Sequence, residues 1–344
     1  MIMKERGFLK AKYLFLYILI FLSPLTGLSK EVNTDRVSSP ARSIHLRFQS
    51  TKQKGEYEFN TGIVRGKLRQ EGKSRGLSAV TYLPQKVQID RSLGLFSFYR
   101  IFSEKTRYGS ALWDRDSFSE LLPNGAVKIV WPAEKEYPFE ITAVYCWMDA
   151  STLDLETIVK PAKDLPKFEI FLASYFHEDF PASYIYAQKE TKHNTPNLDF
   201  VEAKEAGGTW QMYPRDKHVL STITDGRWQL RPNPVNWNIS PFLAAPVGMR
   251  CHENTGLKIV LMASSEDCFA IATPCKNETH YSLYLSLLGR DIKKGQAIRV
   301  RSRLLFGQEL SDSEVLKRYR KFLRELKNIR AYNKTNEKSK RGYF

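Results

Sequence analysis

Residues 167–180 read KFEIFLASYFHEDF, and the alternation within them decides which kind of fold the chain can form. The even positions from 168 to 176 are apolar except for one serine, whereas the odd positions from 167 to 177 mix charges, aromatic rings and a histidine. A period of two residues is typical of a β-strand with one face on a core and the other on something wetter. The polar end of the stretch, His177–Asp179, is then either part of a binding site or only a turn.

Similar strand patterns recur along the body of the chain, and turn signals such as Pro123-Asn124-Gly125 and Asp225-Gly226 separate them. Many short strands, without helix–strand alternation or a fixed repeat, indicate an all-β sandwich or barrel. The strands are expected at residues 44–49, 94–102, 126–131, 139–147, 152–159, 167–176, 183–187, 242–250, 257–263, 269–273, 280–288 and 297–306.

One amphipathic helix is expected to close the domain. Ser311 and Glu314 form a capping-box pattern that marks its start. One face then carries the apolar side chains Val315, Leu316, Tyr319, Phe322, Leu323 and Leu326. After Asn328 the chain turns polar, so residues 329–344 are predicted to be a basic, disordered tail.

The start of the chain has the three parts of a secretory signal peptide. A basic stretch precedes an apolar run over residues 13–22, and small residues follow up to residue 29. The run is too short for a membrane-spanning helix, although an uncleaved anchor remains the alternative. We therefore predict a signal peptide over 1–29, a linker over 30–43 and one β domain with its helix over 44–328, in a protein exported to the periplasm or the extracellular space.

The charge distribution bears on the partners of the protein. The formal net charge is +16, but eleven basic and only two acidic residues fall within 317–344. Because the body is nearly balanced, we expect no nucleic-acid partner. The basic tail suits either a solvated end or contact with an anionic cell envelope.

The four cysteines, Cys146, Cys251, Cys268 and Cys275, have spacings that fit no zinc motif, so we expect no metal and no cofactor. Export permits disulfides, and four cysteines allow three full pairings. Cys268 and Cys275 could join a hairpin, whereas Cys146 is expected in the core.

Three segments concentrate tryptophan, tyrosine, arginine and carboxylate residues: 96–118, 209–218 and 225–237. A sugar has an apolar ring face and a rim of hydroxyls, which suit a flat aromatic ring beside arginine and aspartate. The alternative for any single tryptophan is that it fills the core. The candidate substrate-binding residues are Arg100, Arg107, Trp113, Tyr175, Trp210, Arg215 and Asp216.

The run FEITAVYCWMDASTLDLETIVKPAKDLPKFEIFLASYF, residues 139–176, resembles the central part of galactose mutarotase-like (aldose 1-epimerase-like) proteins. GLKIVLMASSEDCFAIATP and GQAIRVRSRLLF resemble the last strands of that family. The resemblance covers about residues 90–306 and implies a β-supersandwich with a sugar site on its concave sheet. The matching positions are Tyr145, Asp149, Leu153, Leu155, Ser174, Tyr175 and Phe176.

One position departs from the family pattern. Ala173 stands where the family has its catalytic acid, a histidine, and His177 follows on the same strand face roughly 13 Å away. A proton donor must approach to about 3 Å, so the resemblance does not imply simple hexose mutarotation. If the chain is an enzyme, His177 or His280 is the candidate acid and Glu266 the candidate base.

The sequence thus predicts an exported carbohydrate-recognising protein whose ligand is an oligo- or polysaccharide, neutral or acidic. It leaves open whether the protein is a sugar-binding module or a divergent carbohydrate-active enzyme with epimerase- or lyase-like proton transfer. A different class of function is the alternative: a non-catalytic structural or cell-surface protein that binds partners through its aromatic loops and basic tail.

Overall fold

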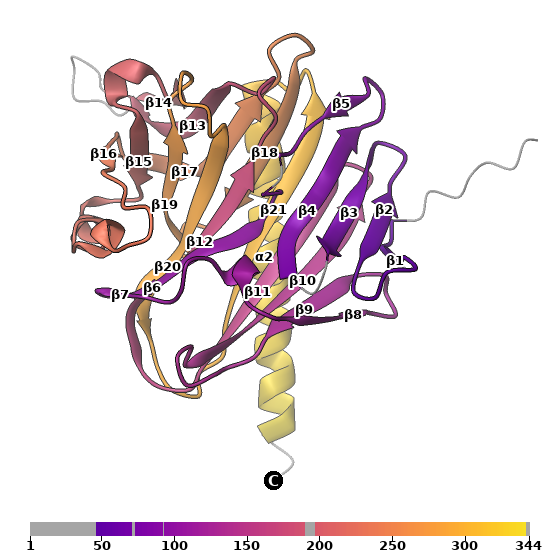
Figure 1. Ribbon diagram of the computed structural model, residues 1–344, viewed down its shortest axis with the longest axis vertical. Helices are drawn as coiled ribbons and strands as arrows, with labels where there is room; N and C mark the ends of the chain where they lie inside the picture. Colours follow the sequence, from indigo (N-terminus) through magenta and orange to yellow (C-terminus); the bar gives the residue numbers. More distant parts are fainter. Residues whose placement is uncertain (1–45, 71–72, 92, 190–196, 342–344) are drawn as a thin grey trace, which may run out of the picture. The chain divides into compact units, whose positions relative to one another are not determined.

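The computed structural model describes residues 46–70, 73–91, 93–189 and 197–341, all within one compact unit, Ser43–Phe344 (Figure 1). The expected signal peptide and linker lie outside the described residues. The described chain is built mainly from strands, which confirms the all-β prediction. None of its helices is long and apolar enough to cross a membrane.

Three sheets form the domain. The 9-stranded sheet has the order β14 (Asn197–Glu202), β13 (Ala182–Lys189), β17 (Leu243–Cys251), β18 (Leu257–Ala263), β21 (Ile298–Gln308), β11 (Thr152–Pro161), β10 (Phe139–Asp149), β9 (Val127–Trp131) and β8 (Phe118–Leu121). The 7-stranded sheet has the order β16 (Asn238–Ile239), β15 (Trp210–Pro214), β19 (Cys268–Pro274), β20 (Ser282–Ile292), β12 (Leu165–Tyr175), β6 (Ser97–Ser103) and β7 (Thr106–Arg107). The 5-stranded sheet runs in chain order through β1 (Gln49–Ser50), β2 (Tyr57–Asn60), β3 (Val64–Gln70), β4 (Lys73–Tyr82) and β5 (Val87–Gln88).

The main core lies among these sheets, and β12 shows how the sequence builds it. Phe168, Ile170 and Leu172 belong to the main core together with side chains of the two other sheets. Phe171 and Tyr175, on the opposite face of the same strand, belong to a second apolar cluster. The period of two residues therefore places β12 between two layers, as the alternation in residues 167–176 predicts.

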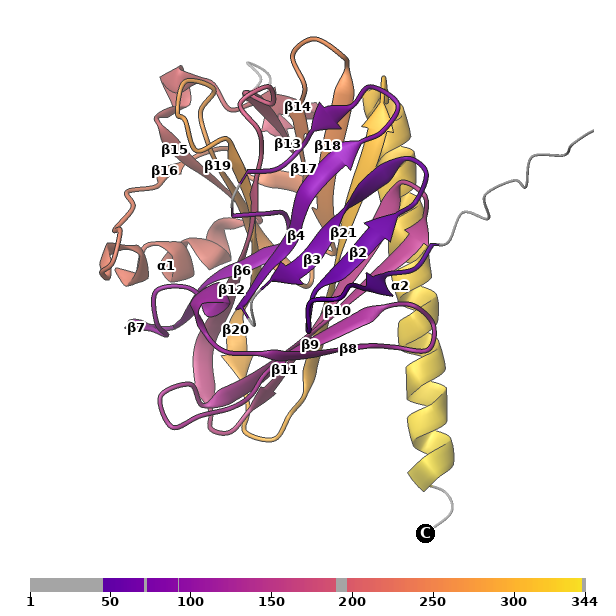
Figure 2. The ribbon, with the colours of Figure 1, turned by 45° about the vertical axis from the view of Figure 1, so that its right-hand side comes forward.

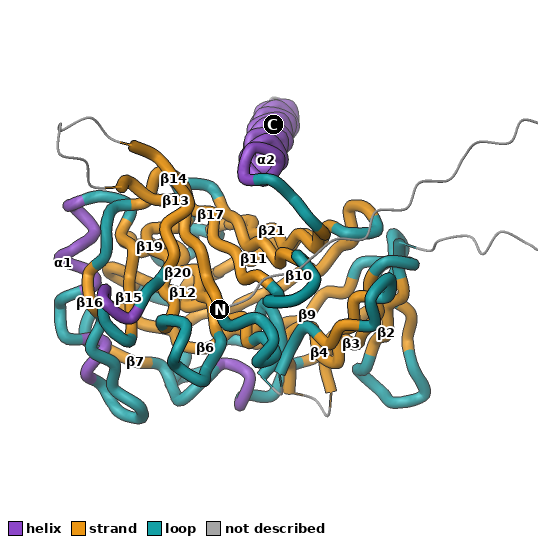
Figure 3. The backbone as a smooth tube through the Cα atoms, turned by 90° about the horizontal axis from the view of Figure 1, so that it is seen from above, coloured by secondary structure: helices purple, strands orange, loops and turns teal. Residues whose placement is uncertain are grey.

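A long helix, α2 (Asp312–Arg341), lies beside β21 and β11 on the outer side of the 9-stranded sheet (Figures 2 and 3). The predicted capping box is confirmed: the Ser311 amide donates to Glu314 Oε2 at 2.8 Å, and the Glu314 amide donates to Ser311 Oγ at 3.3 Å. The predicted apolar face is also confirmed, because Val315, Tyr319 and Phe322 pack in a third cluster against the sheet.

Several expectations about local structure were wrong. The helix continues beyond Asn328 to Arg341, because no glycine or proline interrupts it before Gly342. The strands β2, β3 and β4 were missed, because their charged residues obscure the alternation, and only the last residue of the expected strand 44–49 is in β1.

The cysteines form no disulfide. All four thiols are free, so Cys268 and Cys275 do not join a hairpin. Cys146 lies on β10 and is half-buried, not fully in the core as expected.

Three of the shorter helical turns lie in the long connection between β15 and β17. They are the 3-10 helices Lys217–Val219 and Arg227–Gln229 and the single α-helical turn α1 (Leu220–Ile223). Two other 3-10 turns are Leu112–Asp114 and Glu205–Gly207. Val219, Ile223 and Trp228 pack in the second apolar cluster, so this connection covers the face of the 7-stranded sheet that is turned away from the main core.

Candidate functional site

A cavity of about 330 Å³ lies between the 7-stranded sheet and the connection that covers it. Strands β6, β12, β15 and β20 form its floor, and the segment around residues 228–237 forms the opposite wall. The residues lining this aromatic cavity are Tyr99, Arg100, Phe171, Tyr175, Trp210, Trp228, Asn233, Pro234, Val235, Trp237, His280 and Tyr284. A volume of this size lies at the small end of the range of ligand pockets.

The rings in the cavity wall hold one another in fixed orientations. Phe171 stacks on Tyr284 with ring centroids 4.5 Å apart, and Trp228 meets Trp237 edge to face at 5.2 Å. Trp210 meets Trp237 in the same way at 5.8 Å. Rings that pack in this way present both faces and edges at defined positions, which makes the wall preorganised for a flat apolar surface.

Arg100 supplies the positive charge of the cavity. Its side chain leaves β6 between two rings, 4.8 Å from the centroid of Tyr99 and 5.3 Å from that of Trp228. Nη2 donates to the Asn233 carbonyl at 2.7 Å and to the Tyr99 hydroxyl at 3.3 Å. Nε and Nη1 are buried without a partner, and the indole Nε1 atoms of Trp228 and Trp237 are in the same state.

Two tyrosine hydroxyls meet at the floor. The hydroxyl of Tyr284 donates to that of Tyr175 at 3.4 Å. Burial raises the pKa of Tyr284 to about 12 and also raises the pKa of Tyr175. Both phenols are therefore neutral at neutral pH and offer hydroxyl groups, not phenolates.

His280 stands at the rim of the cavity just before β20. Its Nδ1 lies 2.8 Å from Glu278 Oε1, and its ring meets Trp210 edge to face at 5.0 Å. The carboxylate of Glu278 fixes the orientation of the imidazole, as second partners of functional histidines commonly do.

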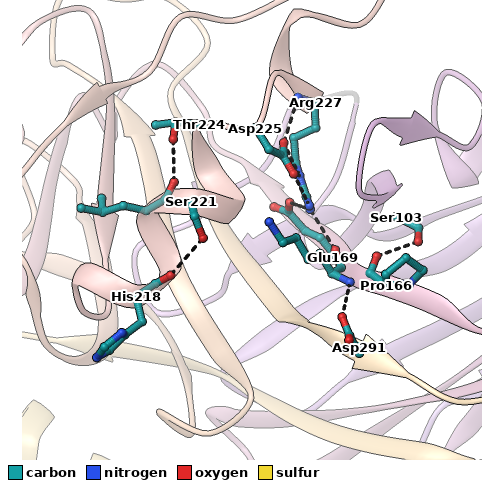
Figure 4. Close-up of polar contacts among 11 residues, drawn as sticks. Ser103, Pro166, Glu169, His218, Ser221, Thr224, Asp225, Arg227 and Asp291 are labelled. Atoms are coloured by element: carbon teal, nitrogen blue, oxygen red, sulfur yellow. Dashed lines mark hydrogen bonds and ion pairs between the residues drawn. The ribbon is translucent and has the colours of Figure 1, made fainter.

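A buried ionic cluster fixes the covering connection to the sheet (Figure 4). The Arg227 Nη1 atom donates to Glu169 Oε2 at 2.8 Å and to the Lys167 carbonyl at 3.1 Å, and Nη2 donates to Asp225 Oδ2 at 2.9 Å. Burial raises the pKa of Glu169, and the guanidinium opposes that shift. Because Trp228 follows Arg227 directly, the cluster also positions one ring of the cavity.

The structure brings together some of the predicted site residues and separates others. Arg100, Tyr175, Trp210 and His280 line the aromatic cavity. Trp113 lies directly behind the lining, stacked on Tyr99 with centroids 4.8 Å apart. Arg107 donates to the Leu230 carbonyl at 3.3 Å and to the Pro232 carbonyl, so it supports the covering segment from behind.

The other predicted residues do not line the cavity. Arg215 forms an ion pair with Asp216 at 2.8 Å, and Glu266 pairs with Arg330 of α2. His177 Nδ1 lies 3.0 Å from Asp179 Oδ2, just past the end of β12. Within the described part of the chain, no group of three or more histidine, cysteine or acidic side chains could hold a metal ion.

Several residues of the cavity lining are not among the predicted site residues. They include Phe171, Tyr284 and Tyr99. A signal for Tyr284 was present, because Ser282, Tyr284 and Ser286 alternate with three leucines on β20. The segment 225–237 was recognised as rich in aromatic residues, but nothing in its sequence indicates which strand face it covers.

Neither a family model nor a curated protein matches this sequence. Among solved structures, a protein from Synechocystis sp. PCC 6803 is 12% identical over 76% of this chain and 99% of its own, with a TM-score of 0.47. The galactose mutarotase related enzyme from Lactobacillus acidophilus is 9% identical over 74% of this chain and 98% of its own, also with a TM-score of 0.47.

An alpha-N-acetylgalactosaminidase from Bifidobacterium bifidum is 10% identical over 78% of this chain and 38% of its own, with a TM-score of 0.48. The backbone of the chain is similar to the backbones of these solved structures, a galactose mutarotase related enzyme among them, with all three TM-scores below 0.5. The TM-scores and coverages describe similarity of the backbone and give no information about activity.

Proposed function

We propose that this protein binds a carbohydrate in the aromatic cavity. The observation that carries the proposal is the packing of tryptophan and tyrosine rings around a cavity that the guanidinium of Arg100 and the Tyr175 and Tyr284 side chains also line. A sugar ring supplies what such a wall lacks, namely an apolar face for the rings and oxygen atoms that accept hydrogen bonds.

Binding without acid–base catalysis is the form of the proposal that the geometry supports best. Proton transfer needs a donor and an acceptor within hydrogen-bond reach of the reacting atoms. The candidate base Glu266 is engaged by Arg330 and does not line the cavity. His280 is the one histidine of the lining, and Glu278 already occupies its Nδ1 atom.

The rival function, docking of another protein through aromatic loops, would require these rings to be exposed on the surface. Trp228 is only 3% exposed, Trp237 is half-buried against it, and Trp210 is half-buried against Trp237. The proposal also includes export, on the basis of the leader-like residues 1–29. Amino-terminal sequencing of the protein recovered outside the cytoplasm would test that part.

The test of sugar binding is a titration of the full protein with a panel of neutral and acidic oligosaccharides, followed by tryptophan fluorescence and thermal unfolding. A ligand at 100 times its Kd adds about 2.7 kcal/mol of stability. Trp237→Ala should abolish the response, whereas Phe118→Ala, an exposed ring on β8, should leave it unchanged. A panel without any response, or a response that Trp237→Ala leaves intact, would exclude the cavity as a sugar site.

A further inference from the structure

The guanidinium of Arg100 is buried without an anionic partner. Its side chain is 3% exposed, and only Nη2 has hydrogen-bond partners, both of them neutral oxygens. Among the described residues, no carboxylate lies within ion-pair distance of it, and no carboxylate lines the aromatic cavity. A buried charge is costly unless it is paired and fully hydrogen-bonded.

Three other buried arginines of the domain pair with carboxylates, whereas Arg250 donates to backbone carbonyls and to the Thr273 hydroxyl. Arg227 pairs with Glu169 and Asp225, Arg303 pairs with Asp154, and Arg115 pairs with Glu134. Each of these side chains holds a structural contact between two segments. Arg100 differs from these three because it lines the aromatic cavity and its hydrogen-bond partners are all neutral.

A second arginine strengthens the positive potential at this wall. Arg107 donates to the carbonyls of Gly109 and Ser110 and to those of the segment that covers the cavity, so its partners are also neutral. Burial lowers the pKa of Arg107, and the nearby charge of Arg100 lowers it further. Two guanidinium groups close enough to repel each other, beside a wall without carboxylates, favour an anion in the cavity.

We propose that the carbohydrate bound in the aromatic cavity carries an anionic group, which lies beside the guanidinium of Arg100 and balances its charge while the sugar ring lies against Trp228 and Trp237. The inference rests on the proposed function and names the class of its ligand. The anionic group is a carboxylate, as in a uronic acid, or a sulfate ester; the planar carboxylate and the terminal oxygens on the tetrahedral sulfur are both anionic acceptors that a guanidinium recognises.

A comparison of acidic sugars with a neutral sugar of the same ring shows whether the protein recognises the charge or only the ring. Galacturonic acid and galactose 6-sulfate are each compared with galactose by titration calorimetry, at low and at high salt. We expect at least one acidic sugar to bind more tightly than galactose and to lose affinity as salt screens the charge. A charge-assisted hydrogen bond in a buried site corresponds to a preference of about 10- to 100-fold. Whichever acid binds more tightly identifies the anionic group.

Variants of Arg100 test whether this side chain is responsible for the preference for an acidic sugar over galactose. Arg100→Gln should lower the affinity for the acid by about 10- to 100-fold and leave that for galactose nearly unchanged, and Arg100→Lys should retain part of the preference. Arg299→Gln is the matched control, because Arg299 is an exposed arginine on β21 that pairs with Glu156. If Arg100→Gln does not fold, the salt dependence and Arg100→Lys decide the question.

Galactose bound as tightly as both acids, or affinities that Arg100→Gln reduces equally for all three sugars, would overturn the inference and leave sugar binding intact. If no sugar binds and Trp237→Ala changes nothing, the proposed function itself fails. These outcomes differ in whether the neutral sugar binds, so the two failures can be told apart.

Discussion

Replacement of Arg227 by methionine is expected to lower the free energy of unfolding by about 3–5 kcal/mol, the cost of leaving one member of a buried ion pair without its partner. The Arg227 side chain is fully buried, and that of Glu169 is 1% exposed. The substitution removes the ion pair to Glu169 at 2.8 Å and the bond to the Lys167 carbonyl at 3.1 Å. The Asp225 side chain is 12% exposed, so water can hydrate its carboxylate once Arg227 is removed. Most of the lost free energy of unfolding therefore arises at the Glu169 carboxylate.

The loss is measured by urea unfolding, with the slope checked so that a change in midpoint can be read as a change in stability. Arg299→Met is the control, since an exposed ion pair contributes about 0–1 kcal/mol. The double variant Arg227→Met/Glu169→Leu should recover much of the loss, because an apolar pair removes the buried charge on both sides. A deficit below about 1 kcal/mol in the single variant, or no recovery in the double variant, would refute the reasoning.

The pH dependence of the single variant gives a third measurement. Without Arg227, the pKa of Glu169 in the folded protein is raised by burial above its unfolded value of about 4.3. The folded state then binds the proton more tightly, so stability is present below the unfolded pKa and is lost as the pH rises through the folded pKa. The deficit of Arg227→Met relative to the native protein should therefore shrink between pH 7 and pH 5.

Three further predictions concern other parts of the domain. Phe322→Ala should cost about 3–5 kcal/mol and make α2 sensitive to limited proteolysis, because this ring is fully buried between the helix and the 9-stranded sheet. Ser311→Ala should cost about 1 kcal/mol in urea unfolding through loss of the capping box. Burial raises the pKa of Cys251 to about 11 and that of Cys268 to about 12, so these thiols should react with a disulfide reagent at pH 8 only after unfolding.

The sequence predicts most of this fold where one face of a strand is apolar. The alternation in residues 167–176 correctly assigns the two sides of β12, and the capping box correctly gives the start of α2. The predicted end of α2 was wrong because a polar composition does not by itself end a helix. A helix ends at a glycine, a proline or a competing contact. Strands such as β3, with the sequence VRGKLRQ, were missed because charged residues occupy their exposed positions.

The site was predictable only in part, because a cavity depends on which strands become neighbours. Arg100 and Tyr175 belong to adjacent strands of the 7-stranded sheet, and Trp210 comes from the same sheet beyond β20 and β19. Local patterns identify each of them as an exposed-face residue or a loop residue. They do not reveal that the connection between β15 and β17 folds over that face, because the ionic cluster of Arg227, Glu169 and Asp225 joins positions far apart in sequence.

The packing around Ala173 leaves no room for the histidine that the sequence resemblance implies at this position. Ala173 pairs with Tyr284 across the strands, and the ring of Tyr284 contacts both Phe171 and Tyr175, the residues two positions before and after the alanine on the same face. The Tyr284 ring therefore occupies the space above residue 173, and an imidazole there would overpack the cluster. The polar groups of this face are instead the paired tyrosine hydroxyls and the guanidinium of Arg100, which has no anionic partner; these groups suit recognition of a ligand more than proton transfer to it.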